Sequence, residues 1–222
     1  MNRFAPKGEP GFTLIELAVV LGIIALLAVL LLPVAEKSLR RADQTEGLSK
    51  VRGIGQAMAQ FAGDHDGTLP GPLWPGQLLE YDPDREGRLV RELAPYLGLA
   101  ETNAVYLARS FAPRAFLRKM PAGQLAQARP YVANLEPTNA AGEILRPLGG
   151  LVEPNLASPM KLAAVPAETR AQWALSDADQ AHRNVRAAAW KANTPAEPIY
   201  GTHRAVLFYD WHAELLPVED LQ

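Results

Sequence analysis

The feature that most constrains this chain is an apolar run from Leu17 to Ala35, interrupted only by Gly22 and Pro33. As a helix it would extend roughly 28 Å, about the thickness of a bilayer's hydrocarbon core. A soluble core helix of this length would normally show a polar face, and this run shows none. A cleaved secretory signal ending at Ala35 is a further alternative, but its apolar region would normally be only about 7–15 residues long. We therefore predict a transmembrane helix.

Basic residues do not orient this helix. Arg3 and Lys7 precede the apolar run, whereas Lys37, Arg40 and Arg41 follow it. Because basic residues favour the cytoplasmic side and here flank both ends, the charge distribution alone leaves the topology open.

Overall composition excludes several kinds of chemistry. The formal net charge of the 222 residues is −2, so no global basic field favours nucleic acid as a partner. The absence of cysteine excludes disulfides, thiol catalysis and cysteine-ligated zinc. Phosphate-binding glycine loops, Gly-x-Ser-x-Gly elbows and zinc-binding His-Glu-x-x-His helices are also absent. We expect a protein that is not an enzyme.

One acid, Glu16, lies at the start of the apolar run, just after Gly11 and Phe12. A charged side chain inside hydrocarbon costs about 2.5–3.5 kcal/mol on insertion scales and is a functional candidate by default. An incidental acid at the membrane interface, where the cost is small, is the alternative.

The stretch KGEPGFTLIEL (residues 7–17) resembles the cleavage and methylation signal of type IV prepilins and type II secretion pseudopilins. The resemblance implies that residues 1–11 are a leader, that a prepilin peptidase cuts after Gly11, and that Phe12 becomes the N-methylated first residue. Glu16 is then the family's acid at mature position five. Pro33 falls at mature position 22, where a helix-kinking proline is common, and we expect a kink or local melting there.

The resemblance also implies a function and partners. We expect a structural subunit of the pseudopilus in a type II secretion-like system, which serves protein secretion. Its partners would be the prepilin peptidase/N-methyltransferase, other pseudopilin or pilin subunits and an inner-membrane assembly platform, with no nucleic acid expected. The chain would cross the bacterial inner membrane once through residues 12–35, with its amino terminus cytoplasmic and its head periplasmic.

Two alternatives stay open. One is a minor type IV pilin for adhesion or DNA uptake, and the other is a signal-anchored periplasmic enzyme or metal-binding protein. Whether the subunit is major or minor is not decided by the sequence.

Residues 36–62 are predicted to continue the helix as an amphipathic segment. Apolar residues recur there at three- and four-residue spacing and would form one helical face: Leu48, Val51, Ile54, Met58 and Phe61. Within this stripe, Gly53 and Gly55 would allow a sheet to approach closely. The helix should end near Gly63 or Gly67.

Residues 63–222 are predicted to form the head, which makes the fold class α+β and pilin-like: a long helix packed on a small antiparallel sheet with many loops. A closing hairpin is expected from strands 206–209 and 213–216, and a further strand from 173–176, with Asp177 and Asp179 in the loop after it. A short helix over 88–97 would stop at Gly98, and residues 100–166 are expected to be proline-punctuated loops and short helices.

The end of the chain also resembles a pseudopilin-like group whose members carry a histidine, nine residues, then Asp-Gly. Here His203 and Asp210 are separated by only six residues, and Trp211 replaces the glycine. Because tryptophan tolerates positive φ poorly, we expect a loop that is longer than a two-residue primed turn or of another type.

Acidic residues in the head provide a weak candidate for a calcium site, since major pseudopilins bind calcium. Asp64 and Asp66 flank His65, but this stretch lacks the further ligands of a full calcium loop. The other candidates would have to meet them in space: Asp177, Asp179 and Asp210, with His203 and His212 nearby. Such residues at turns are more often caps or solvated surface. No other cofactor is expected.

Overall fold

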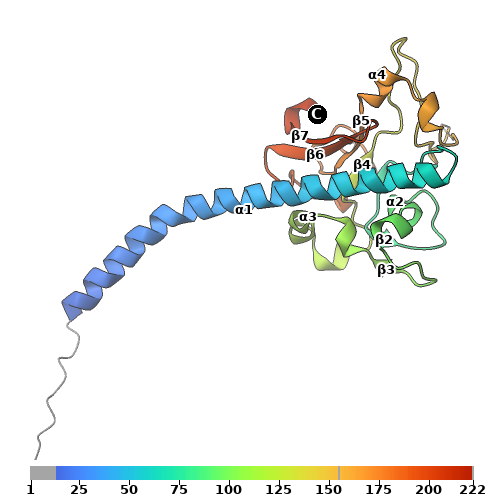
Figure 1. Cartoon of the computed structure of the whole chain (residues 1–222). Coiled ribbons are helices and arrows are strands. Elements are labelled where there is room, and N and C mark those ends of the chain that lie inside the picture. The colour runs from blue at the N-terminus through green and yellow to red at the C-terminus, as the bar shows by residue number, and fades with distance from the viewer. Residues whose placement is uncertain (1–13, 155, 222) are drawn as a thin grey trace, which may run out of the picture. The chain divides into compact units, whose positions relative to one another are not determined.

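A single long helix dominates the computed structural model, which describes residues 14–154 and 156–221 (Figure 1). This helix, α1, spans Leu14–Asp64. The chain divides into two compact units, Met1–Arg41 and Ala42–Gln222. The first contains the apolar part of α1, and the second contains the rest of α1 and the head.

The head is built on an antiparallel sheet of five strands in the order β1-β4-β5-β6-β7. A separate two-stranded antiparallel sheet pairs β2 with β3. The strands are β1 Gly76–Gln77, β2 Glu80–Tyr81, β3 Tyr106–Leu107, β4 Tyr131–Ala133, β5 Trp173–Asp177, β6 His203–Phe208 and β7 Ala213–Pro217. The predicted α+β fold, a long helix with a small antiparallel head, is confirmed.

Short helices occupy the connections between the strands. The α-helices are α2 Leu89–Glu92, α3 Arg114–Lys119 and α4 Ala167–Arg170. Single 3₁₀ turns are found at Pro95–Leu97, Arg109–Phe111, Ala122–Gln124, Leu162–Ala164, Lys191–Asn193 and Val218–Leu221.

The predicted apolar stripe of α1 packs into the head core. Val51, Ile54, Met58 and Phe61 are buried, and Leu48 is half-buried against the same cluster. Close approach of the sheet is found only at Gly55, where an added Cβ would lie 2.6 Å from Cδ1 of Leu207 in β6. The expectation for Gly53 was wrong, because an added Cβ there would meet nothing within 4 Å.

Two helical glycines provide a matched pair of stability predictions. At Gly47 an added Cβ would lie 1.6 Å from the hydroxyl oxygen of buried Tyr200, whereas the space at Gly53 is open. Gly53→Ala should raise the free energy of unfolding by about 0.5–1 kcal/mol, because alanine loses less backbone entropy in a helix. Gly47→Ala should lower it by about 1–3 kcal/mol through overpacking. Urea unfolding in detergent, followed by tryptophan fluorescence, measures both; a shift in the same direction would contradict this packing.

The helix α1 ends at Asp64, close to Gly63 and Gly67 as predicted, and left-handed residues follow it. Asp66 and Gly67 have φ of 53° and 78°. The amide of Gly67 donates to the carbonyl of Ala62 at 2.8 Å, which satisfies one of the last carbonyls of the helix.

The hairpin of β6 and β7 has a longer loop than a two-residue turn, as expected. The Trp211 amide donates to the Phe208 carbonyl, and the Phe208 amide donates to the His212 carbonyl, both at 3.0 Å. These bonds are typical of a turn followed by a left-handed residue, and Trp211 takes that position with φ of 72°. The half-buried Trp211 packs against the main core, which holds it in a conformation that normally favours glycine.

Two expectations for the head were wrong in part. Asp177 is the last residue of β5 and does not lie in a loop. All five residues of β5 are buried, and a second apolar cluster containing Val185 and Leu221 packs on this strand. The region 100–166 contains two strands, β3 and β4, besides loops and short helices.

The helix predicted over 88–97 is divided into α2 and the 3₁₀ turn Pro95–Leu97. Proline at position 95 has no amide hydrogen to continue the helical bonding. Gly98 then ends the segment in a left-handed conformation with φ of 62°, as predicted.

Candidate functional site

The apolar part of α1 exposes a large hydrophobic surface. Residues 14–42 are all exposed, and the exposed fraction of large apolar side chains reaches 87% at Leu14. Soluble monomers rarely expose contiguous apolar patches larger than a few hundred Å². Among the described residues, α1 is the one helix long and apolar enough to cross a membrane. The surface therefore needs a cover of lipid or of other subunits.

Glu16 is the one ionisable side chain between residues 12 and 35. It lies in the first turn of α1 and is exposed, as are its neighbours Ile15 and Val19. The helix dipole favours an anion at this end. A carboxylate in this apolar setting can serve to bind a cation that enters the same environment.

The predicted scission and methylation site, Gly11 and Phe12, lies outside the described residues. The same holds for the predicted leader, residues 1–11. These assignments stay predictions.

Pro33 lies inside α1, and the helix is continuous on both sides of it, so the expected local melting is not seen. The proline ring cannot donate a hydrogen bond to the carbonyl of Val29, four residues earlier. The role of Pro33 in assembly stays a prediction.

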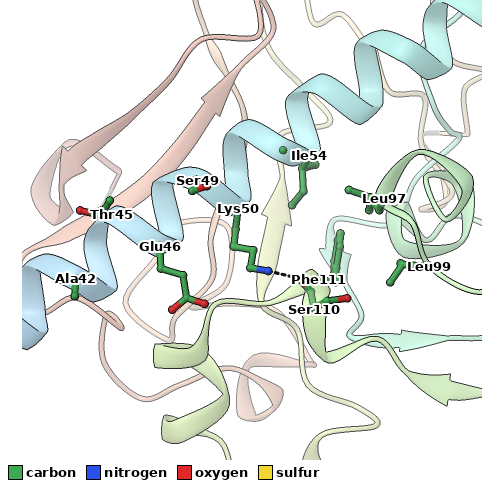
Figure 2. A pocket seen from close by; sticks show the side chains of 11 residues that line it. Ala42, Thr45, Glu46, Ser49, Lys50, Ile54, Leu97, Leu99, Ser110 and Phe111 are labelled. Atoms are coloured by element: carbon green, nitrogen blue, oxygen red, sulfur yellow. Dashed lines mark hydrogen bonds between the residues drawn. The ribbon is translucent and has the colours of Figure 1, made fainter.

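Polar contacts join the head end of α1 to the segment that follows β3. Arg118 Nη2 lies 2.5 Å from Asp43 Oδ2, and Lys50 Nζ donates to the Ser110 carbonyl at 2.8 Å. Figure 2 shows Lys50 reaching across to this segment, beside Glu46 and Phe111. A groove of about 730 Å³ lies here, between α1 and residues 97–111, and Gly53 forms part of its wall. The surface of α1 that lines this groove is thus only partly covered by the rest of the head.

The five acidic residues considered for calcium lie in different settings. Asp64 accepts a hydrogen bond from the Tyr96 hydroxyl at 2.9 Å, and Asp210 contacts His212 in the hairpin loop at 2.5 Å. Asp66 belongs to the turn that ends α1. Within residues 14–154 and 156–221, no three His, Asp or Glu side chains are grouped so as to hold a metal ion. Calcium binding stays a prediction without support from this geometry.

Asp179 and Arg204 form a buried ion pair that the sequence did not reveal. Arg204 Nε lies 2.6 Å from Asp179 Oδ2 and Nη2 lies 2.9 Å from Oδ1, with both side chains only 1% exposed. Arg204 Nη1 also donates to the Val218 carbonyl at 2.9 Å. The pair therefore anchors the carboxy-terminal turn to β6 and is structural. The signal that could have indicated it was a lone arginine inside an apolar strand.

Asp177 is the other buried carboxyl. Its Oδ2 accepts the Ala205 amide at 2.7 Å, while its Oδ1 has no hydrogen-bond partner among the described residues. Burial, together with the charge of Asp179, raises the pKa of Asp177 to about 8, against the opposing effects of the Ala205 amide and the Arg204 charge. The carboxyl is therefore mostly protonated at neutral pH.

This raised pKa predicts a pH dependence of stability. Between about pH 4 and pH 8 the folded head holds a proton on Asp177 that the unfolded chain releases, so this group's contribution falls as pH rises. Asp177→Asn removes that dependence. Its free energy of unfolding, relative to wild type, should increase steadily from pH 4 to pH 8 when measured by urea unfolding. Asp210→Asn, in the exposed loop, is the control; a constant Asp177→Asn difference over this range would contradict a protonated Asp177.

Comparison with known proteins gives a match in the amino-terminal segment only. Residues 6–32 match the family model described as the prokaryotic N-terminal methylation motif. No curated protein and no solved structure gave a significant match. The motif supports the type IV pilin and pseudopilin class, and it implies processing by a prepilin peptidase and assembly with pilin-type subunits. The long apolar helix is consistent with membrane anchoring of such a protein.

Proposed function

We propose that this chain is a pseudopilin-like structural subunit, cleaved after Gly11, N-methylated at Phe12 and assembled into the pseudopilus of a type II secretion-like system. The observation that carries the proposal is a methylation motif directly joined to an exposed apolar helix with a single acid. This combination suits a subunit that is stored in a membrane and then packed among identical helices.

In this proposal the subunit crosses the inner membrane once, with its amino terminus cytoplasmic and its head periplasmic. An ATPase-driven assembly platform adds subunits, and the growing fibre pushes secreted protein outward. The head needs no catalytic site or cofactor for this role.

Glu16 has a specific role in assembly. Cleavage after Gly11 would create a charged amine at Phe12, one helical turn away from the carboxylate. When subunits stack, Glu16 neutralises the Phe12 amine of a neighbour, and this pairing offsets most of the cost of removing both charges from water. Subunits in the wrong register would leave both charges unpaired.

Deletion of the gene distinguishes a role in protein secretion from the alternative role as a minor type IV pilin. We expect exported proteins to accumulate in the periplasm of the deletion strain, and secretion to return when the wild-type chain is supplied. Supplying a chain with Gly11→Asp, which blocks scission, should not restore secretion. Loss of surface pili or of DNA uptake, with normal secretion, would instead assign the chain to a pilus.

A further inference from the structure

Three arginines line one pocket at the edge of the head sheet. Arg85, Arg88 and Arg129 surround a space of about 320 Å³, together with Glu80, Gln127 and Asn193. The pocket lies beside β1, the edge strand that follows Trp74. Its wall carries three guanidinium groups and the carboxylate of Glu80, and the carboxylate of Asp82 lies 3.2 Å from Arg85, so positive charge is in excess.

The fold holds two of these arginines in fixed positions. Arg88 Nη1 and Arg129 Nη1 both donate to the carbonyl of Gly76, at 3.0 and 2.6 Å. The guanidinium of Arg129 also lies 5.0 Å from the ring centroid of Trp190, and that of Arg88 lies 5.9 Å from the centroid of Trp74. Such stacking restricts the planar groups and leaves their edges available for hydrogen bonds.

The absence of a side chain at Gly76 allows Arg129 and Trp190 to pack at this position. An added Cβ would lie 2.7 Å from Cδ of Arg129 and 2.9 Å from the ring of Trp190. Glycine at this strand position therefore lets the arginine and the tryptophan pack directly on the backbone whose carbonyl binds both guanidinium groups.

Most hydrogen-bond donors of this pair are not used by the protein. Each guanidinium has five N–H donors. Within the part of the chain that the structure describes, Gly76 is the one acceptor of Arg88 and Arg129, and the Nε atom of each is buried without a partner. Among the described residues, no ion pair includes Arg88 or Arg129, although the charge of Glu80 acts on Arg88.

Crowding of like charges makes this arrangement costly when the pocket is empty. Burial, together with the charges of Arg129 and Arg85, lowers the pKa of Arg88 to about 10, against the opposing effect of the Glu80 carboxylate. Burial also lowers the pKa of Arg129, with Arg85 adding to the effect. Arg85 forms ion pairs with Asp82 at 3.2 Å and Glu80 at 3.8 Å, and the charge of Glu80 also acts on Arg88. An anion in the pocket would relieve the repulsion.

We propose that this three-arginine pocket binds a phosphate group, either free or as a phosphomonoester. Arginine forks match the oxygens of a phosphate, and the negative charge of a phosphate balances the excess of positive charge in the wall. The volume of about 320 Å³ leaves room for a small group attached to the phosphate. The pocket lies on the head, so the ligand would be met outside the membrane.

Calorimetric titration of the full chain in dodecyl maltoside micelles tests this proposal. Inorganic phosphate and glycerol 3-phosphate are titrated separately at pH 7 and constant ionic strength. We expect saturable binding of at least one; tighter binding of the ester identifies a phosphomonoester site, and binding of inorganic phosphate alone identifies a site for free phosphate. Both results support the pocket.

Substitution of the pocket arginines tests whether these residues bind the phosphate. Arg129→Gln should weaken it about tenfold or more, because a hydrogen bond to a charged group is lost. Arg85→Gln changes an exposed side chain and keeps the fold, so it provides the test if Arg129→Gln does not fold. Arg186→Gln, another exposed arginine, is the control and should bind as wild type. Absence of saturable binding by the wild type, or equal affinity in wild type and Arg85→Gln, would overturn the proposal.

Discussion

Glu16→Gln is expected to stop assembly of the subunit while leaving cleavage and methylation intact. Glutamine keeps the size and the helix propensity of the side chain but removes its charge. In our proposal the Phe12 amine of the neighbouring subunit would then be buried without a counter-charge. Breaking a buried ion pair costs about 3–5 kcal/mol, which weakens each subunit contact by more than about a hundredfold.

The measurement is the amount of chain in sheared or cross-linked filaments relative to the membrane pool. Glu36→Gln is the matched control, because Glu36 lies on the same helix beyond the apolar run. Processed Glu16→Gln subunits should remain in the membrane, whereas Glu36→Gln subunits should assemble. Normal assembly of processed Glu16→Gln would show that the carboxylate does not pair with the amine.

Asp179→Ala is expected to lower the free energy of unfolding of the head by about 3–5 kcal/mol. The change leaves the guanidinium of Arg204 buried, with 1% of its side chain exposed and no counter-charge from Asp179. It also removes a restraint on Arg204, whose Nη1 donates a hydrogen bond to the Val218 carbonyl. The four tryptophans, Trp74, Trp173, Trp190 and Trp211, all lie in the head, so urea unfolding followed by their fluorescence reports this change.

Two further experiments test whether the cost of Asp179→Ala comes from the burial of the charges or from the loss of an ion pair as such. Asp43→Ala removes the partner of Arg118, whose side chain is 59% exposed, and should cost less than about 1 kcal/mol. A double variant, Asp179→Leu with Arg204→Met, should recover much of the stability because no charge remains buried. Equal costs for Asp43→Ala and Asp179→Ala would contradict the structural role of the buried pair.

Patterns with a regular period were the most predictable parts of this fold. The stripe from Leu48 to Phe61 recurs with helical spacing and is the face that packs on the sheet. The closing hairpin was predictable because two apolar runs flank a polar loop, although the positive φ of Trp211 was not. In that case core packing overrides the local preference of the side chain.

Short elements and long-range polar contacts were not predictable from the sequence. Strand β4 has only three residues, Tyr131–Ala133, yet it lies between β1 and β5. So short a strand gives no periodic signal, and its neighbours in the sheet decide its conformation. Asp179 and Arg204 are 25 residues apart, and Arg88 meets Arg129 through the Gly76 carbonyl. Only the folded topology brings such groups together.

The amino-terminal signal could be read for a different reason. Gly11, Phe12 and Glu16 lie within the matched residues 6–32 and Pro33 follows them, at a spacing that is fixed along the chain and requires no tertiary structure to be read. The roles of these residues stay predictions. The acidic residues considered for calcium carried no such spacing, and the structure places them in turns, in the hairpin loop and in the core.

In our proposal this chain is a processed, methylated subunit. The mass of its mature amino-terminal peptide, from cells with and without the prepilin peptidase, tests this processing. We expect an N-methylated peptide beginning at Phe12, present only when the peptidase is present. A peptide beginning at Met1 in both strains, or at Glu36 after signal-peptide cleavage, would contradict it.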